Sequence, residues 1–232
     1  MKITWFGHSA FRIDIGASAI LIDPFLSGNP SFKGDPVAAA EGATHVLVTH
    51  GHDDHVGDAA AIAARAGAQI VANYEICMHL MEQGARNINP GNTGGTVPCG
   101  DFTVSFTQAL HSSGTTREGN SIYLGNPNGL VIRHKDAPAI YHMGDTDVFG
   151  DMALIAELYA PKIGMVPVGD RFTMSGTSAA FAVKRYFALD VAFPCHYGTF
   201  DLLDATPDAF VKGLAGTKTR VMTPKPGEAT VF

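Results

Sequence analysis

The chain has 232 residues, enough for one large domain with a sizeable hydrophobic core. A hydrophobic content of 46% beside a charged content of 16% excludes a disordered chain, and a formal charge of −6 argues against nucleic acid as the main partner. No apolar run reaches the length of a membrane span, no signal-peptide pattern opens the chain, and the three cysteines are odd in number and widely spaced. We therefore expect residues 1–232 to form a single cytoplasmic domain with reduced thiols.

The first half of the chain mixes short β-type runs with two helical stretches. Gly16-Ala17-Ser18 predicts a hairpin turn, and the Gly-, Pro- and Asn-containing segment Phe25–Ala40 predicts a long loop that could form a rim or lid. The predicted strands are Lys2–Phe6, Ala10–Ile15, Ala19–Ile22, His45–Val48, Gln69–Ala72, Thr96–Cys99 and Phe102–Gln108. The predicted helices are Val56–Arg65 and Tyr74–Gln83, each followed by a glycine.

The second half has the same mixture, without an internal repeat or an interdomain linker. The predicted strands are Ser121–Leu124, Leu130–Arg133, Ala139–His142, Ile163–Val168, Val191–Pro194 and Thr219–Met222. The predicted helices are Asp151–Tyr159, Ser178–Ala188 and Pro207–Leu214. Strands crowd the first and third quarters and helices lie between strands elsewhere, so the chain can stack two sheets and cover both outer faces with helices.

A histidine-rich loop directly follows the predicted strand His45–Val48. His50 and His52 are two residues apart, so in an extended chain they point to the same side. Asp54 and His55 are adjacent where a helix should begin, so they diverge toward a second point in space. Imidazole nitrogens and carboxylate oxygens are ligands of zinc and other first-row divalent ions, so this one loop can hold two metals.

Three later residues each stand just past a predicted strand. His111 follows Phe102–Gln108, Asp145 follows Ala139–His142, and His196 follows Val191–Pro194. Singly, such a histidine is more often a hydrogen-bonded structural residue, and Asp145 could be a turn residue or a helix cap. Together with the histidine loop they make five histidines and two aspartates. Seven ligands are what a site with three protein ligands per ion and one shared carboxylate requires.

Six motifs, including the His-x-His-x-Asp-His stretch, resemble the metallo-β-lactamase superfamily. They resemble most its branch of small bacterial and archaeal metal-dependent hydrolases of largely unassigned substrate, which is related to the ascorbate-6-phosphate lactonase-like proteins. The similarity runs over nearly the whole chain. The motifs are Gly7-His8-Ser9, His50–Gly57, Leu110–Gly114, Gly125–Gly129, Tyr141–Thr146 and Pro194–Phe200.

The resemblance implies an α+β fold, the αββα sandwich of two stacked mixed sheets with helices on both outer faces. It implies that His50, His52 and His111 hold a first metal and that Asp145 bridges to a second. Asp54, His55 and His196 would be the other ligands of that second ion. It also implies a homo-oligomer, for which no sequence feature gives independent support.

One loop departs from the pattern of that branch, in which a Gly-Gly-x-Phe-Thr-Met-Gly-Pro-like sequence is expected. This chain reads Gly169-Asp170-Arg171-Phe172-Thr173-Met174-Ser175-Gly176, so a charged pair enters and the Gly-Pro step is lost. We expect Arg171, Thr173 and Met174 on the substrate side of this loop, so the substrate specificity of this chain would differ from that of the family branch.

The ligand set predicts hydrolysis by a metal-bridging hydroxide, because two divalent ions roughly 3.5–4 Å apart lower the pKa of a shared water toward neutrality. No Gly-x-Ser-x-Gly elbow supplies a serine nucleophile. Asp54 would bind metal and orient the attack, and His8 or His142 could protonate the leaving group. His8 is equally compatible with an ordinary turn histidine. Asp23 and His142 are candidates for hydrogen-bonding the ligating imidazoles.

The predicted function is metal-dependent hydrolysis of a small-molecule ester, lactone or phosphodiester with two divalent ions per chain. Zinc suits a site rich in imidazole, and manganese, nickel and iron also fit these ligands. A first alternative is a phosphodiesterase or nuclease acting on RNA or nucleotides, although the acidic chain shows no basic insertion for RNA. A second alternative is a metal-binding sensor without turnover.

Overall fold

The computed structural model describes all residues from Met1 to Phe232. Its strands form two large mixed sheets and one separate hairpin. The first sheet has the order β15 (Ala229–Val231), β1 (Lys2–Trp5), β2 (Phe11–Ile15), β3 (Ser18–Ile22), β4 (His45–Leu47), β5 (Gln69–Val71). The second has the order β14 (Arg220–Val221), β13 (Val191–Cys195), β12 (Ile163–Pro167), β11 (Ile140–His142), β10 (Asn128–His134), β7 (Phe102–Gln108), β6 (Thr96–Cys99).

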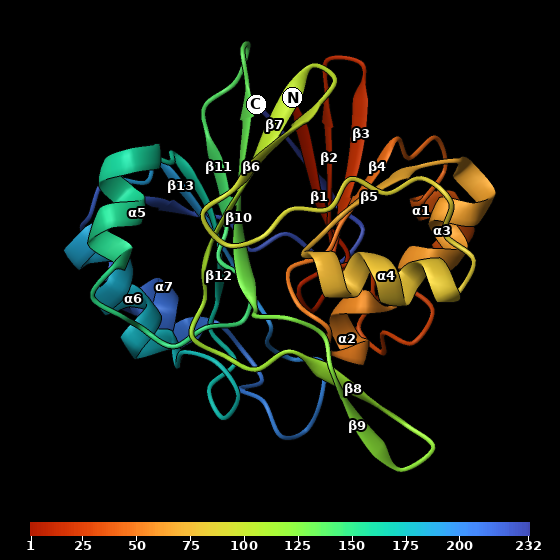
Figure 1. The fold of residues 1–232 in the computed structure, drawn as a ribbon. Coiled ribbons are helices and arrows are strands. Elements are labelled where there is room, and N and C mark those ends of the chain that lie inside the picture. The colour runs from red at the N-terminus through yellow and green to blue at the C-terminus, as the bar shows by residue number, and fades with distance from the viewer.

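The two sheets stack face to face, and helices cover both outer faces (Figure 1). One apolar cluster lies between the sheets, and two others lie between a sheet and its helices. Strand alternation produces this division: Ile20 and Ile22 belong to the cluster between the sheets, whereas Leu21 faces the helices. The helices are α1 (Pro36–Ala39), α2 (Asp53–Val56), α3 (Ala59–Ala66), α4 (Tyr74–Glu82), α5 (Met152–Tyr159), α6 (Gly176–Tyr186) and α7 (Asp208–Leu214).

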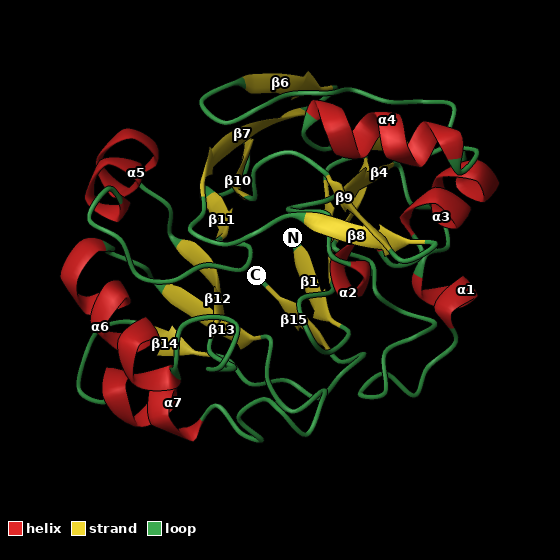
Figure 2. Ribbon diagram, turned by 60° about the horizontal axis from the view of Figure 1, so that its bottom comes forward, coloured by secondary structure: helices red, strands yellow, loops and turns green.

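This arrangement confirms the predicted αββα sandwich. Figure 2 shows the strands between one helix layer of α1, α3 and α4 and another of α5, α6 and α7. Each sheet is mixed: β1, β2 and β3 are antiparallel while β3, β4 and β5 are parallel, and β11 to β14 are parallel beside antiparallel β10, β7 and β6. No helix combines the length and the apolar character needed to cross a bilayer.

The predicted helix Val56–Arg65 is wrong at its start, because two helices occupy the region. Gly57 separates α2 from α3 with a φ of +43°, and a Cβ there would lie 2.6 Å from the Cα of Phe25. The chain therefore turns sharply just after the histidine loop, where the segment from Pro24 onward presses against it. Within the predicted long loop Phe25–Ala40, the last residues form α1, which Asp35 caps by accepting from the N–H of Val37.

Two strands were not predicted. The first, β8 (Gly114–Arg117), pairs only with β9 (Asn120–Tyr123), and the hairpin projects from the body of the molecule (Figure 1). The second, β15, pairs with β1 at the edge of the first sheet and joins the two ends of the chain. Neither has a strong β-type pattern of its own, since β8 reads Gly-Thr-Thr-Arg and β15 reads Ala-Thr-Val.

Candidate metal centre

One buried carboxylate anchors the loop that follows β4. Asp23, directly after β3, accepts hydrogen bonds from the backbone N–H of Thr49 to Oδ1 at 2.8 Å and from its hydroxyl to Oδ2 at 2.7 Å. Because the Thr49 hydroxyl gives its proton to Asp23, its oxygen accepts from His50 Nδ1 at 3.0 Å. His50 is thereby held in the tautomer whose Nε2 carries no proton and is free to bind a metal.

Asp23 also selects the tautomer of His55. His55 Nδ1 donates to Asp23 Oδ2 at 2.8 Å, so in the neutral imidazole Nε2 is the nitrogen without a proton. That Nε2 is buried, has no hydrogen-bond partner and lies 3.3 Å from Asp145 Oδ2. Buried polar atoms almost always have a bonding partner, and a metal ion beside Nε2 would be that partner.

The ligand atoms of the seven expected residues gather at two points. His50, His52 and His111 bring their nitrogens within 4.8 Å of one another, with His50 Nε2 and His52 Nδ1 3.0 Å apart. His52 has an extended backbone, so it points to the same side as His50, as its spacing predicts. The second group brings together Asp54, His55 and His196 within the same limit, and it also includes His8.

Asp145 lies between the two groups. Its Oδ2 is 2.9 Å from His196 Nε2 and 3.3 Å from His55 Nε2 on one side. On the other side it is 3.7 Å from His111 Nε2 and 3.9 Å from His50 Nε2. Asp145 Oδ1 and His196 Nδ1 are buried and unpartnered. One carboxylate thus faces ligand nitrogens of both groups, which is the position that a bridging ligand needs.

Burial and charge set the protonation of these groups. Burial holds the pKa of His50 well below the ordinary value, and it also lowers the pKa of His52 and His111. Burial acts in the same direction on His55, but the carboxylates around it prevail and raise its pKa well above the ordinary value. Burial opposes ionisation of Asp145, yet His196 and His55 hold the pKa of its carboxyl well below the ordinary value. Metal ions bind neutral imidazoles and ionised carboxylates. The lowered pKa values of His50, His52 and His111 favour the binding form, whereas His55 has to release its Nε2 proton when an ion binds.

His8 joins the second group through a short chain of hydrogen bonds. His8 Nε2 lies 2.9 Å from Asp54 Oδ2, and His8 Nδ1 lies 3.1 Å from Thr199 Oγ1. Since Asp54 is an acceptor, His8 Nε2 donates to it, and Nδ1 is left to accept from the Thr199 hydroxyl, which also lies 3.3 Å from the carbonyl oxygen of Tyr197. Burial lowers the pKa of His8 to about 4, even though the hydrogen bond to Asp54 acts in the opposite direction. Sequence reasoning did not assign a role to Thr199, although it lies inside the Pro194–Phe200 motif that contains His196.

His142 has a different environment from the one expected. Its Nε2 donates to the carbonyl of Ser9 at 3.1 Å, and its Nδ1 accepts from the N–H of Gly144 at 3.1 Å. Both ring nitrogens are therefore engaged by the backbone, and neither bonds to a ligand residue or holds a proton for a substrate. His142 instead ties the loop after β1 to the loop that carries Asp145.

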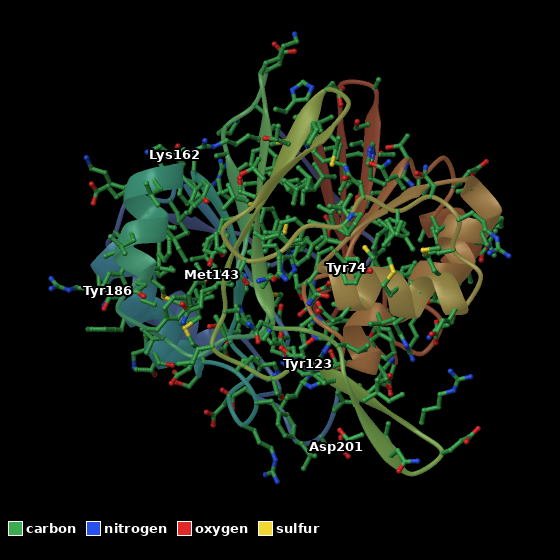
Figure 3. All side chains as sticks on the ribbon, viewed as in Figure 1. Tyr74, Tyr123, Met143, Lys162, Tyr186 and Asp201 are labelled. Carbon is green, nitrogen blue, oxygen red and sulfur yellow. The ribbon has the colours of Figure 1, made fainter.

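A cavity of about 930 Å³ opens onto this site. The loop that departs from the family pattern contributes Phe172 to its wall, whereas the expected Arg171, Thr173 and Met174 do not line it. Met174 is buried in the apolar cluster beneath α5 and α6, and the Thr173 hydroxyl bonds to the carbonyl of Met174. Tyr123 on β9 and Asp201 in the loop after β13 lie at the same end of the molecule, the end where the cavity opens (Figure 3).

Most of the cavity wall was not predicted residue by residue. The hairpin and the segment before it contribute hydroxyl side chains, and three separate loops contribute apolar ones. Besides the metal-site residues, the lining consists of Phe25, Asp53, Ser112, Ser113, Gly114, Thr115, Thr116, Ser121, Ile122, Tyr123, Phe172, Phe200 and Leu203. Phe25 begins the segment that was expected to form a rim, and in this respect the prediction and the structure agree.

Comparison with known proteins identifies the family. The model of the beta-lactamase superfamily domain matches residues 18–224. The chain belongs to this superfamily. Within it, the chain is 62% identical over 232 residues to a "UPF0173 metal-dependent hydrolase" of Methylocella silvestris, and the match covers 100% of both chains. It is 56% identical over 230 residues to a protein of the same name from a Chelativorans species, covering 98% of each. The chain is thus a member of the UPF0173 metal-dependent hydrolases.

A solved structure of this superfamily agrees with the fold. Igni18, a novel metallo hydrolase from the archaeon Ignicoccus hospitalis, matches with a TM-score of 0.88 at 34% identity, covering 100% of this chain and 97% of that one. The resemblance inferred from the sequence motifs is therefore confirmed, and so is the metallo-β-lactamase fold.

Proposed function

We propose that this chain is a binuclear metal-dependent hydrolase that cleaves a small-molecule ester, lactone or phosphodiester. The observation that carries the proposal is the placement of Asp145, whose Oδ2 faces His196 and His55 on one side and His111 and His50 on the other. The buried unpartnered atoms His55 Nε2 and Asp145 Oδ1 support a metal beside them.

The residues fit two divalent ions, which, when bound, would lower the pKa of a water molecule and polarise the scissile group. His50, His52 and His111 would hold one ion, and Asp145 would reach both. Asp54, His55 and His196 would hold the other. Asp23 contributes by keeping His50 and His55 in the tautomers that offer Nε2.

His8 has a positioning role in this proposal. Its Nε2–H holds one oxygen of Asp54, so the orientation of that carboxylate is set before substrate arrives. The same proton is the one available near a leaving group, because both nitrogens of His142 are engaged by the backbone. Thr199 keeps that proton on Nε2 by donating to Nδ1.

The finer assignments are also proposals. Zinc is the first choice of metal because five of the seven ligands are imidazoles, and manganese, nickel and iron remain candidates. A cytoplasmic location is supported by the three cysteines, which are all buried and unpaired.

The test compares Asp145→Ala with Asp147→Ala, an exposed aspartate two residues further along. Each protein is stripped with a chelator, reconstituted with zinc or manganese, and analysed for metal content. Turnover is measured on a 4-nitrophenyl ester, a lactone and bis(4-nitrophenyl) phosphate. We expect two ions per chain and turnover in the wild type and in Asp147→Ala, and loss of both metal and turnover in Asp145→Ala.

Two results would contradict the proposal. Turnover that survives complete removal of metal would exclude the metal-dependent mechanism. Full occupancy of both sites in Asp145→Ala would exclude the bridging role of this carboxylate.

A further inference from the structure

The cavity that opens onto the metal site has no cationic side chain in its wall. None of its 18 lining residues is lysine or arginine, and Asp53 adds a carboxylate beyond the two that belong to the metal site. The rim loop does carry Arg171, but its guanidinium carbon lies 5.6 Å from the centroid of the neighbouring Phe172 ring, and Arg171 is not part of the lining. An anionic substituent held away from the metals would therefore meet no counter-charge.

One wall of the cavity is apolar and partly exposed. Phe172 is 51% exposed and Phe200 is 42% exposed, which is unusual for large aromatic side chains at a polar site. Phe25 lies beside Phe200 with ring centroids 6.3 Å apart, and both rings contact the imidazole of His8 edge-on. An apolar surface thus begins directly next to the second group of metal ligands, where a substituent of the scissile group would lie.

Another part of the cavity wall offers neutral hydroxyls. The Thr115 hydroxyl donates to Asp53 Oδ1 at 2.7 Å, so part of that carboxylate's hydrogen-bonding capacity is already used. Thr116 and Ser121 face each other across the β8–β9 hairpin, and neither hydroxyl bonds within the chain. Such groups can bind a carbonyl or ether oxygen, but they do not compensate a full negative charge.

We propose that this cavity selects an uncharged substrate, an ester or lactone whose substituent is aromatic or branched apolar, and discriminates against substrates that carry an anionic group on that substituent. In the reaction, the oxygen of water bonds to the acyl carbon, the acyl C–O bond breaks, and one proton passes to the leaving oxygen. This substrate preference rests on the proposed hydrolase function. It also separates the chain from nucleases, whose substrates carry a phosphate at every nucleotide and need cations along the groove.

The test uses two ligands with the same metal-binding head and different tails, benzohydroxamic acid and 4-carboxybenzohydroxamic acid. Their dissociation constants are measured by calorimetry on the zinc-reconstituted protein. We expect the neutral compound to bind at least about tenfold more tightly, since only the carboxylated ring places a charge against the uncompensated wall. Equal affinity, tighter binding of the carboxylated ligand, or failure of both to bind would overturn the proposal.

A matched pair of variants places the effect in the cavity. Phe172→Lys adds a cation to the lining, whereas Phe181→Lys adds one at a 54% exposed position on α6 outside the lining. We expect Phe172→Lys to reduce the preference for the neutral ligand at least about fivefold and Phe181→Lys to leave it unchanged. The same shift in both variants, or in neither, would contradict the assignment of the preference to this wall.

Turnover distinguishes this proposal from the hydrolase function on which it rests. Selective hydroxamate binding without cleavage of any ester, lactone or phosphodiester would leave the charge preference standing and contradict the hydrolase function. Cleavage of neutral and carboxylated esters with equal kcat/KM would leave the hydrolase function standing and overturn the substrate class.

Discussion

The role of Asp23 can be tested with Asp23→Asn, which keeps the size of the side chain. Asp23 has a φ of +45°, a conformation that asparagine tolerates better than alanine does. The carboxylate accepts from Thr49 N–H, from the Thr49 hydroxyl and from His55 Nδ1. The backbone N–H of Thr49 can only donate, whereas His55 can change its tautomer and accept instead. The amide oxygen is therefore expected to stay opposite Thr49 N–H, which leaves the amide NH₂ facing the hydroxyl and His55.

The consequences are a loss of stability and a loss of metal binding. Removing a hydrogen bond to a fully buried carboxylate costs about 1.5–3 kcal/mol of unfolding free energy. His55 must accept at Nδ1 and carry its proton on Nε2, and a rotated Thr49 hydroxyl that donates to His50 Nδ1 would have the same effect there. Since both ligands then present a protonated nitrogen, zinc affinity should fall about 10–100-fold, the usual effect of losing such a partner.

The assay is zinc affinity by chelator competition, together with denaturant unfolding of the metal-free protein. Asp101→Asn is the control, because Asp101 also accepts from a hydroxyl, Ser18 Oγ at 2.6 Å, and faces an imidazole, His134 Nε2 at 3.4 Å. Asp101 lies in the β6–β7 turn and reaches Ser18 at the β2–β3 turn, at the far end of the sheets from α2 (Figure 1). Wild-type zinc affinity in Asp23→Asn would refute the reasoning, as would an equal loss in Asp101→Asn.

Three further perturbations address the turn after the ligands, the positioning of His8 and the buried thiols. In denaturant unfolding, Gly57→Ala should lower the unfolding free energy by at least about 2 kcal/mol more than Gly67→Ala does. Both glycines have a positive φ, but only a Cβ at Gly57 would meet other atoms, among them backbone atoms of Pro24 and Phe25. Equal losses in the two variants would contradict this. Thr199→Val should lower kcat about tenfold, while metal analysis still finds both ions, because His8 loses the donor that keeps its proton on Nε2. An unchanged kcat would show that the hydroxyl has no such role. Burial raises the pKa of Cys77 to about 12, so this thiol should not react with a disulfide reagent in the native protein, and rapid reaction would contradict its burial. Its contribution to stability is full below the ordinary thiol pKa of 9.0 and is lost as pH rises from there toward the folded value, so unfolding midpoints should decrease over that range.

Local sequence pattern was sufficient for the histidine loop and for the strands beside it. The run before Thr49 is apolar and fully buried, and the spacing of His50 and His52 in an extended chain puts both nitrogens at one point whatever the rest of the fold does. The two stacked sheets were predictable for the same reason. Alternating residues such as Ile20, Leu21 and Ile22 must face two different apolar layers, and the interleaved helices provide the outer ones.

Tertiary structure decided the features that depend on partners distant in sequence. The break at Gly57 arises because the segment after Pro24 crosses against it, and β15 is a strand because it pairs with β1 from the other end of the chain. The cavity wall combines Phe25, Phe172 and Phe200 from three loops, and no local pattern relates them. The same holds for hydrogen positions: Asp23 and Thr199 select the tautomers of His55 and His8 from 32 and 191 residues away. The sequence alone therefore determined which side chains could bind metal, and only the fold determined which of their nitrogens face one another and which side chains form the cavity wall beside them.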